Sequence, residues 1–155
     1  MSILIKKIFK TETAHIVRLA SSQRCRESVH GHSYKWIVTI LDEEKLKENG
    51  MVIDFIDLKP IKEFIDQFDH AMILWQNDTQ QFKDFFLNNC ERVIIMLKNT
   101  TAENMAKLIH KFTQDWLKIS YPNRLLICKK VEVWETETGC GMATSSDNND
   151  IIIIK

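Results

Sequence analysis

Two segments near the start of the chain alternate between apolar and polar positions. Residues 3–15 carry branched and aromatic side chains broken by lysines and threonines, a pattern typical of a half-exposed strand. Residues 33–41 alternate more regularly, with Tyr34 at the start of the apolar face. The polar loop over residues 16–29 is longer than the usual hairpin connection, and loops of that kind are often functional. We therefore predict a hairpin whose connecting loop is a candidate for function.

Two later segments have the period of an amphipathic helix. In the first, we expect Asp57 to cap a helix with Pro60 in its first turn, where proline is tolerated. Its apolar stripe consists of Leu58, Ile61, Ile65 and Phe68. In the second, Thr100 and Glu103 have the spacing of a capping box. The apolar stripe that follows consists of Ala102, Met105, Ala106, Ile109, Phe112 and Trp116.

The remaining apolar runs complete the predicted fold. Residues 125–135 suit a strand and residues 139–144 its return strand, while the short apolar run at 93–97 suits an extra strand. The end of the chain, residues 145–155, is a polar linker followed by an apolar tail, and the pattern does not place it. The order strand, strand, helix, helix, strand, strand predicts one α+β domain over residues 1–155, with both helices on one face of an antiparallel sheet.

Composition and charge narrow the possible functions. A hydrophobic content of 45% is enough for a single core, and the formal net charge is zero. The chain therefore lacks the basic surface expected for binding nucleic acid or an anionic membrane. The N-terminal lysines follow a very short apolar run, the reverse of a secretory signal, so we expect a cytoplasmic protein. The four cysteines include no Cys-x-x-Cys pair, which favours reduced thiols.

Three histidines and one cysteine are the candidate metal ligands. His30 and His32 lie two residues apart, so in a strand their rings point to the same face. His15 ends the facing strand of the hairpin, and Cys25 lies in the loop between. Catalytic zinc usually takes three protein ligands and leaves a fourth position for water or substrate. These residues predict a zinc site, although the histidine pair alone would also suit a surface strand. Cys25 is then a fourth ligand of a closed site, an inert thiol or a catalytic thiolate.

Six short motifs, in order along the chain, resemble those of one known family. They are Ala14-His15, Cys25 with His30-Gly31-His32, residues 50–55 with Leu58-Lys59, Asp69-His70, residues 101–104, and Glu135-Thr136. Together they resemble the 6-pyruvoyl-tetrahydropterin synthase and 6-carboxy-tetrahydropterin synthase family. The resemblance implies a tunnelling fold, in which ββααββ subunits join their sheets into a barrel, usually as a homohexamer with active sites between subunits. It also implies zinc as the metal and 7,8-dihydroneopterin triphosphate as the substrate.

The resemblance implies a role for each motif residue. The three histidines, His15, His30 and His32, would hold zinc. Cys25 would remove a carbon-bound proton from the substrate, and His70, oriented by Asp69, would relay that proton.

Glu135 would bind the N–H and amino groups of the pterin, which a carboxylate fits well. Thr101 and Glu103 would contribute to substrate binding. Each motif also has a structural interpretation. Asp69-His70 suits a helix C-terminus, Glu135 suits a solvated strand end, and the residues near 101 suit a helix cap.

The residues around Cys25 bear on which product is formed. Four residues separate Cys25 from His30; queuosine-branch relatives have three there and biopterin-branch relatives have five. Glu27 and His30 match the Glu-x-x-His pattern of folate-branch relatives, which release 6-hydroxymethyl-dihydropterin. Because a thiolate near zinc is the better base at neutral pH, we favour the queuosine-branch product, 6-carboxy-tetrahydropterin, formed with acetaldehyde and triphosphate. The 6-pyruvoyl and hydroxymethyl products are alternatives, and a zinc-stabilised binding module is the non-enzymatic alternative.

One region departs from the family pattern. After Asp69-His70 the family usually has two residues and then Leu-Asn, whereas this chain continues with residues 71–75, Ala-Met-Ile-Leu-Trp. The stretch over residues 75–98 is also longer than in compact members. We expect these differences to change the wall of the pocket rather than the catalytic groups.

Overall fold

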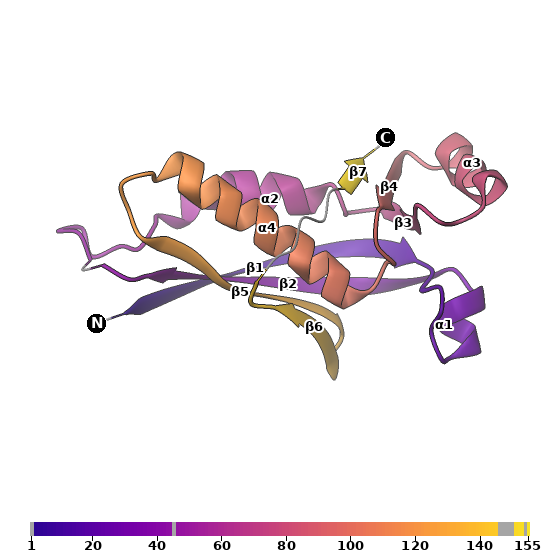
Figure 1. Ribbon diagram of the computed structural model, residues 1–155, viewed down its shortest axis with the longest axis horizontal. Coiled ribbons are helices and arrows are strands. Elements are labelled where there is room, and N and C mark those ends of the chain that lie inside the picture. Colours follow the sequence, from indigo (N-terminus) through magenta and orange to yellow (C-terminus); the bar gives the residue numbers. More distant parts are fainter. Residues whose placement is uncertain (1, 45, 146–150, 154) are drawn as a thin grey trace.

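A seven-stranded sheet runs through the molecule in the order β6-β5-β2-β1-β3-β4-β7 (Figure 1). The structure is a computed structural model that describes residues 2–44, 46–145, 151–153 and 155. The strands are β1 (Ile3–His15), β2 (His30–Asp42), β3 (Ala71–Trp75), β4 (Arg92–Met96), β5 (Leu126–Thr136), β6 (Gly139–Ala143) and β7 (Ile151–Ile153). The helices are α1 (Gln23–Glu27), the 3-10 helix η1 (Phe55–Leu58), α2 (Lys59–Asp66), α3 (Gln80–Asn89) and α4 (Ala102–Ser120). Within the described ranges, none of these helices is both long and apolar enough to span a membrane.

The antiparallel half of the sheet confirms the predicted fold class. β1 and β2 pair along their whole length, from Ile3 opposite Asp42 to His15 opposite His30. β5 then pairs antiparallel with both β2 and β6. The two predicted helices, α2 and α4, lie side by side over one face of these four strands (Figure 1). The result is the expected α+β arrangement with two helices on one face of the sheet.

The main core lies between this sheet and the two helices. Alternate strand residues point toward the helices, and the rings of Tyr34 and Trp36 are completely buried there. Ile61 and Ile65 of α2 and Met105 of α4 are also fully buried in the same cluster. Burying one large apolar side chain contributes about 1.5–3 kcal/mol to the stability of the fold. The apolar residues, which recur every two positions in the strands and every 3.6 in the helices, therefore determine which faces of the sheet and helices pack together.

The pairings of β3 with β1 and β4 are parallel, and this part of the sheet was only partly predicted. β3 pairs parallel with β1 and with β4, so the strand expected at 93–97 is confirmed while the strand at 71–75 was missed. Both strands are buried on both faces, and such strands read as continuous apolar runs without alternation. A parallel pair also needs a crossover connection, which here contains α3, a helix the sequence analysis did not predict.

A second, smaller core lies under α3. Met72 and Leu74 of β3 point away from α2 and pack with Ile16 and with Phe82 and Phe86 of α3. Because alternate residues of one strand point to opposite faces, α3 covers the face of β3 and β4 that α2 does not. The C-terminal tail, which the sequence did not place, adds β7 antiparallel to β4; residues 146–150 of the linker lie outside the described residues.

Two predicted helix caps are wrong by one turn or less. Asp57 lies inside the 3-10 helix η1 that precedes α2, and Asp54 caps η1 instead, accepting from the backbone N–H of Ile56 at 3.1 Å. The N-cap position of α2 itself is Leu58, whose side chain makes no capping bond. Thr101, not Thr100, caps α4, accepting from the N–H of Asn104 at 3.3 Å. The Thr100 hydroxyl instead donates to the carbonyl of Ile16 at 2.7 Å.

Gly141 allows β6 to pack directly against the start of α4. A Cβ atom at this position would lie 2.4 Å from the backbone nitrogen of Glu103 and 2.5 Å from the carbonyl carbon of Ala102. At Gly139, the nearest atom would be the Thr136 hydroxyl at 3.5 Å, an ordinary contact. Of these two glycines, Gly141 is therefore the one that close packing requires.

We expect Gly141→Ala to lower the free energy of unfolding by about 1–3 kcal/mol, the usual cost of overpacking a core. Gly139→Ala is the matched control and should lower it by much less. Thermal unfolding at equal protein concentration measures both. Equal losses in the two variants would contradict the packing described here.

Candidate active site

Three histidine rings meet at the end of the β1–β2 hairpin. The strand register places His15 opposite His30 and Thr13 opposite His32, so all three imidazoles lean toward the helix-covered face. One ring nitrogen from each lies within 4.8 Å of the others. The ring centroid of His15 is 4.6 Å from that of His30 and 5.1 Å from that of His32. The structure thus brings together the three residues that the sequence suggested as metal ligands.

Backbone carbonyls hold each of these rings in one orientation. Nδ1 of His15 lies 2.8 Å from the carbonyl oxygen of Thr100, and Nδ1 of His30 lies 2.9 Å from that of Ser28. The backbone of Glu135 also hydrogen-bonds the ring of His32. A carbonyl oxygen can only accept, so Nδ1 of His15 and of His30 carries the proton. In the neutral rings, Nε2 is then left with a bare lone pair, which is how metal-binding histidines are usually held.

The spacing of the bare nitrogens fits a metal ion. Nε2 of His15 and Nε2 of His30 are 3.1 Å apart, a distance at which two lone pairs repel unless a cation lies between them. A shared proton is disfavoured, since burial lowers the pKa of His15 to about 4 and also lowers the pKa of His32. Two nitrogens of a tetrahedral site with bonds of ~2.0–2.1 Å would be about 3.3 Å apart. The three-histidine group therefore fits a divalent metal that prefers nitrogen.

A carboxylate and a tyrosine lie beside the histidines. The hydroxyl of Tyr34 donates to Oε1 of Glu135 at 3.1 Å, and the same oxygen is 3.8 Å from Nε2 of His15. Burial and the Glu135 carboxylate raise the pKa of Tyr34, so its hydroxyl stays protonated and can serve as this donor. Within the described part of the chain, Oε2 of Glu135 forms no hydrogen bond, and the side chain is partly exposed. One carboxylate oxygen is thus available to a ligand next to the metal position.

Tyr34 is the functional residue that the sequence analysis overlooked. The period of two puts Tyr34 on the same strand face as His30 and His32, and this shared face was the available signal. The carbonyl of Thr100 was also missed, because a backbone group leaves no trace in the residue type.

The residues at the start of α4 act in the structure as caps and supports. Thr101 caps the helix, and Glu103 is exposed in its first turn, where an acidic residue complements the helix dipole. Their part in substrate binding stays a prediction. Thr100, one residue earlier, links this helix start to the carbonyl of Ile16 and to the ring of His15.

Cys25 lies on the short helix α1, in the loop that joins β1 to β2. Its backbone carbonyl accepts from the N–H of Val17 at 3.0 Å, and its side chain is half-buried. Among the residues described, the thiol does not belong to the group whose ligand atoms gather within 4.8 Å. This geometry favours an open three-histidine site over a closed site with one sulfur and three nitrogens.

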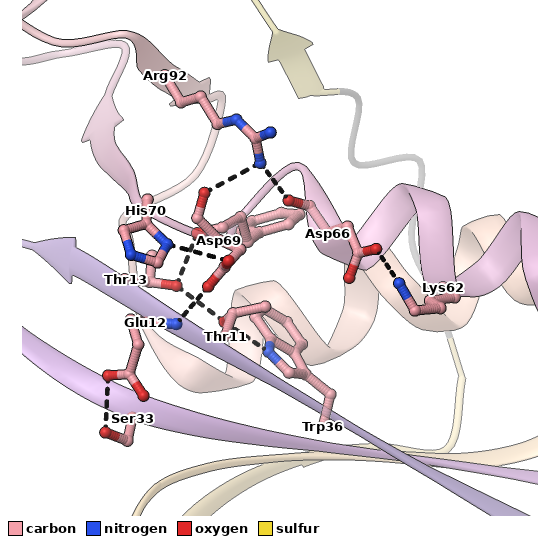
Figure 2. A network of polar contacts seen from close by, with 11 residues as sticks. Thr11, Glu12, Thr13, Ser33, Trp36, Lys62, Asp66, Asp69, His70 and Arg92 are labelled. Atoms are coloured by element: carbon pink, nitrogen blue, oxygen red, sulfur yellow. Dashed lines mark hydrogen bonds and ion pairs between the residues drawn. The ribbon is translucent and has the colours of Figure 1, made fainter.

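Asp69 and His70 project from the start of β3 (Figure 2). Oδ1 of Asp69 accepts from the backbone N–H of Glu12 at 2.8 Å, and Oδ2 lies 3.0 Å from Nδ1 of His70. The bond from Glu12, and to a smaller extent the one from His70, lowers the pKa of Asp69. The carboxylate is therefore ionised at neutral pH and lies within hydrogen-bond distance of the imidazole, and its part in a proton relay stays a prediction.

The His70 ring points outward and does not reach Cys25. The side chain is 79% exposed, and its backbone has a φ of +56°, in the left-handed region that histidine adopts more readily than most residues. The guanidinium of Arg92 holds the carbonyls of Asp66 and Asp69 (Figure 2). In the described residues, Cys25 and His70 form no hydrogen bond with each other. Within one chain, the predicted relay is not assembled.

The chain matches a known protein family over most of its length. The family model described as 6-pyruvoyl tetrahydropterin synthase matches residues 4–145. A 6-carboxy-5,6,7,8-tetrahydropterin synthase from Helicobacter pylori strain J99 is 30% identical over 140 residues, which cover 88% of this chain and 70% of the relative. An enzyme of the same name from Rickettsia felis is 37% identical over 93 residues, covering 57% of this chain and 65% of the relative.

Solved structures share the fold at lower identity. An uncharacterized protein from Wolinella succinogenes aligns with a TM-score of 0.77 at 20% identity, over 93% of this chain and 98% of that one. The 6-pyruvoyl tetrahydropterin synthase of Caenorhabditis elegans aligns with a TM-score of 0.64 at 23% identity, over 94% of this chain and 97% of that one. These likenesses bear on the fold alone.

We expect alanine at His15, His30 or His32 to lower the amount of zinc retained after reconstitution with one equivalent and desalting. Two imidazoles cannot hold the ion as rigidly as three. Metal analysis of the desalted protein measures this. His70→Ala, which removes an exposed imidazole outside the group, should retain as much zinc as wild type. Full retention by His15→Ala would contradict the assignment of the three rings.

Proposed function

This chain belongs to the 6-pyruvoyl tetrahydropterin synthase family, and we propose that it is a zinc-dependent 6-carboxy-5,6,7,8-tetrahydropterin synthase. The substrate would be 7,8-dihydroneopterin triphosphate, and the products 6-carboxy-tetrahydropterin, acetaldehyde and triphosphate, a step toward queuosine-type 7-deazapurines. The observation that carries the proposal is the group of three histidine ring nitrogens, within 4.8 Å of one another, beside the Glu135 carboxylate. The similarity to relatives named for the carboxy product supports the choice among pterin products.

The metal position would be held by His15, His30 and His32. Zinc bound there would supply a Lewis acid that polarises the hydroxyl-bearing side chain of the substrate. The bonds from backbone carbonyls pre-orient these ligands, so little reorganisation is needed when the metal binds.

Glu135 would fix the orientation of the pterin ring. Tyr34 holds one carboxylate oxygen, and the other is free to accept from the N–H and amino groups of the ring. A carboxylate held in this way can select a flat ligand with two adjacent donors. Because Glu135 lies within 4 Å of His15, the bound ring would present its side chain toward the metal position.

Cys25 would act as the base that removes a carbon-bound proton from the polarised side chain. The alternative base, Glu27, is engaged elsewhere: it accepts hydrogen bonds from Gln23 at 2.9 Å and Arg26 at 3.4 Å, which lower the pKa of its carboxyl and weaken it as a base. Glu27 is also largely exposed on α1. These contacts favour the thiol over the folate-branch arrangement.

His70 would relay the proton in the active site of a neighbouring copy of the chain. Its exposed ring contacts Asp69 and, within the residues described, forms no hydrogen bond with Cys25 of its own chain. β6 forms one edge of the sheet, and the face opposite the helices exposes Ile8 and Met142. Edges and uncovered apolar faces of this kind are usually closed by association. We therefore include in the proposal a homohexamer with shared active sites.

Incubation with 7,8-dihydroneopterin triphosphate, followed by mass spectrometry of the products, tests the proposed reaction. We expect wild type to release acetaldehyde and 6-carboxy-tetrahydropterin. Cys25→Ala should lose both, because the base is gone, whereas Glu27→Ala should keep most of the activity. The hydroxymethyl product, lost in Glu27→Ala and kept in Cys25→Ala, would instead place the chain in the folate branch.

Mixed oligomers test whether the relay crosses between chains. Cys25→Ala and His70→Ala chains, co-expressed with different tags and purified through both, should be more active than either variant alone. Random mixing would restore about a quarter of the sites, those that pair an intact Cys25 with an intact His70 of a neighbour. Replacing the second partner by the Cys25→Ala/His70→Ala double variant is the control and should restore nothing. Mixed oligomers no more active than their parents would place both residues in one chain.

A further inference from the structure

We propose that Arg18 is a positioning residue that holds the Cys25 helix α1 in place, with Asp78 as its partner. The inference rests on the function proposed above only in giving Cys25 a catalytic role. Arg18 lies three residues after His15, and Asp78 lies in the turn between β3 and α3. The side chain of Arg18 therefore connects the loop that carries Cys25 to the segment that is longer here than in compact relatives.

Asp78 and Phe82 hold the side chain of Arg18 in place. Its Nε donates to Oδ1 of Asp78 at 2.7 Å, and the Asp78 side chain is almost completely buried. Oδ2 of Asp78 accepts from the backbone N–H of Trp75 at 2.9 Å, which keeps the carboxylate in a fixed position. The guanidinium also lies over the ring of Phe82, 4.9 Å from its centroid. A planar guanidinium suits this arrangement, since it can stack and donate in several directions at once.

The free end of the guanidinium reaches α1. Nη1 of Arg18 donates to the carbonyl of Arg26 at 3.3 Å, one residue after Cys25. The N–H of Val17 donates to the carbonyl of Cys25 itself at 3.0 Å. The short helix is therefore tied through two successive carbonyls to the segment that directly follows β1. A helix of five residues has little stability of its own, so such ties decide where its side chains lie.

The same segment is joined to the metal position. The side-chain amide of Asn99 donates to the carbonyl of Arg18, and the hydroxyl of Thr100 donates to that of Ile16 at 2.7 Å. The carbonyl of Thr100 in turn accepts from His15. Arg18 thus belongs to one connected set of contacts that links the histidine group to the Cys25 helix. Its function would be to set the distance between the base and the metal position.

A second buried ion pair in the chain serves as a matched control. Arg124 donates to Asp42 at 2.6 Å and to the carbonyl of Val52, and Asp42 is fully buried. This pair joins the far end of β2 to the turn before β5 and touches neither α1 nor the histidines. Arg124→Lys should therefore lower the stability about as much as Arg18→Lys does, without any effect on Cys25.

The test compares Arg18→Lys with Arg124→Lys in the full zinc-loaded oligomer. We expect Arg18→Lys to lower kcat about tenfold or more with KM within about twofold, because lysine cannot stack and donate in two directions together. The Val17 amide donates to Cys25, and the Arg26 and Ser28 amides donate to Ser22 and Arg24 within the α1 segment. Hydrogen exchange of these three amides should accelerate about tenfold or more when α1 is released. Zinc content should be unchanged. Arg124→Lys should lower the thermal midpoint while leaving kcat and these amides within about twofold of wild type.

Asp78→Asn keeps the size of the side chain and removes its charge, so it should shift kcat and exchange in the same direction, and it decides the matter if Arg18→Lys does not fold. Unchanged exchange at the three amides in a folded Arg18 or Asp78 variant would overturn the proposal, as would an equal loss of kcat in Arg124→Lys. If wild type forms no pterin product, the proposed function fails, while the exchange comparison still shows whether Arg18 holds α1.

Discussion

The register of the β1–β2 hairpin is the constraint on which the rest of the site depends. Residues two apart share a face, so a slip of one residue would turn His30 and His32 to the opposite side from His15. The buried rings of Tyr34 and Trp36, on the same face as the histidines, make such a slip costly because they would leave the core. The geometry of the three imidazoles is therefore secured by hydrophobic packing far larger than the site itself.

The loops around the hairpin end then complete the site with main-chain groups. The carbonyls of Ser28, Thr100 and Glu135 come from three different parts of the chain and each faces one histidine ring. Thr100 lies at the start of α4, whose approach to β6 requires a glycine at position 141. The packing of a helix and a strand thus controls the tautomer of a candidate metal ligand.

Much of this could be predicted from the sequence, and the failures have physical reasons. The strict alternation of residues 33–41 predicts a strand. The run at 71–75 is apolar on both faces, so it does not alternate and gave no such signal. The stripe of α3 is short, and its cap Thr79 is followed three residues later by Phe82 rather than by the Glu or Gln of a capping box, so its phenylalanines were not assigned to a helix. The histidines could be identified by residue type and spacing. Their carbonyl partners and the Tyr34–Glu135 contact depend on tertiary structure, which local patterns do not contain.

In the proposed site, three histidine nitrogens hold the metal and Cys25 lies outside its coordination shell. X-ray absorption at the zinc edge of the loaded protein tests this most directly, because nitrogen and sulfur scatter at different distances. The proposed site should give three nitrogen scatterers at about 2.0–2.1 Å with an oxygen from water in the remaining position. A sulfur scatterer at about 2.3 Å would place Cys25 on the metal and contradict its role as a free base.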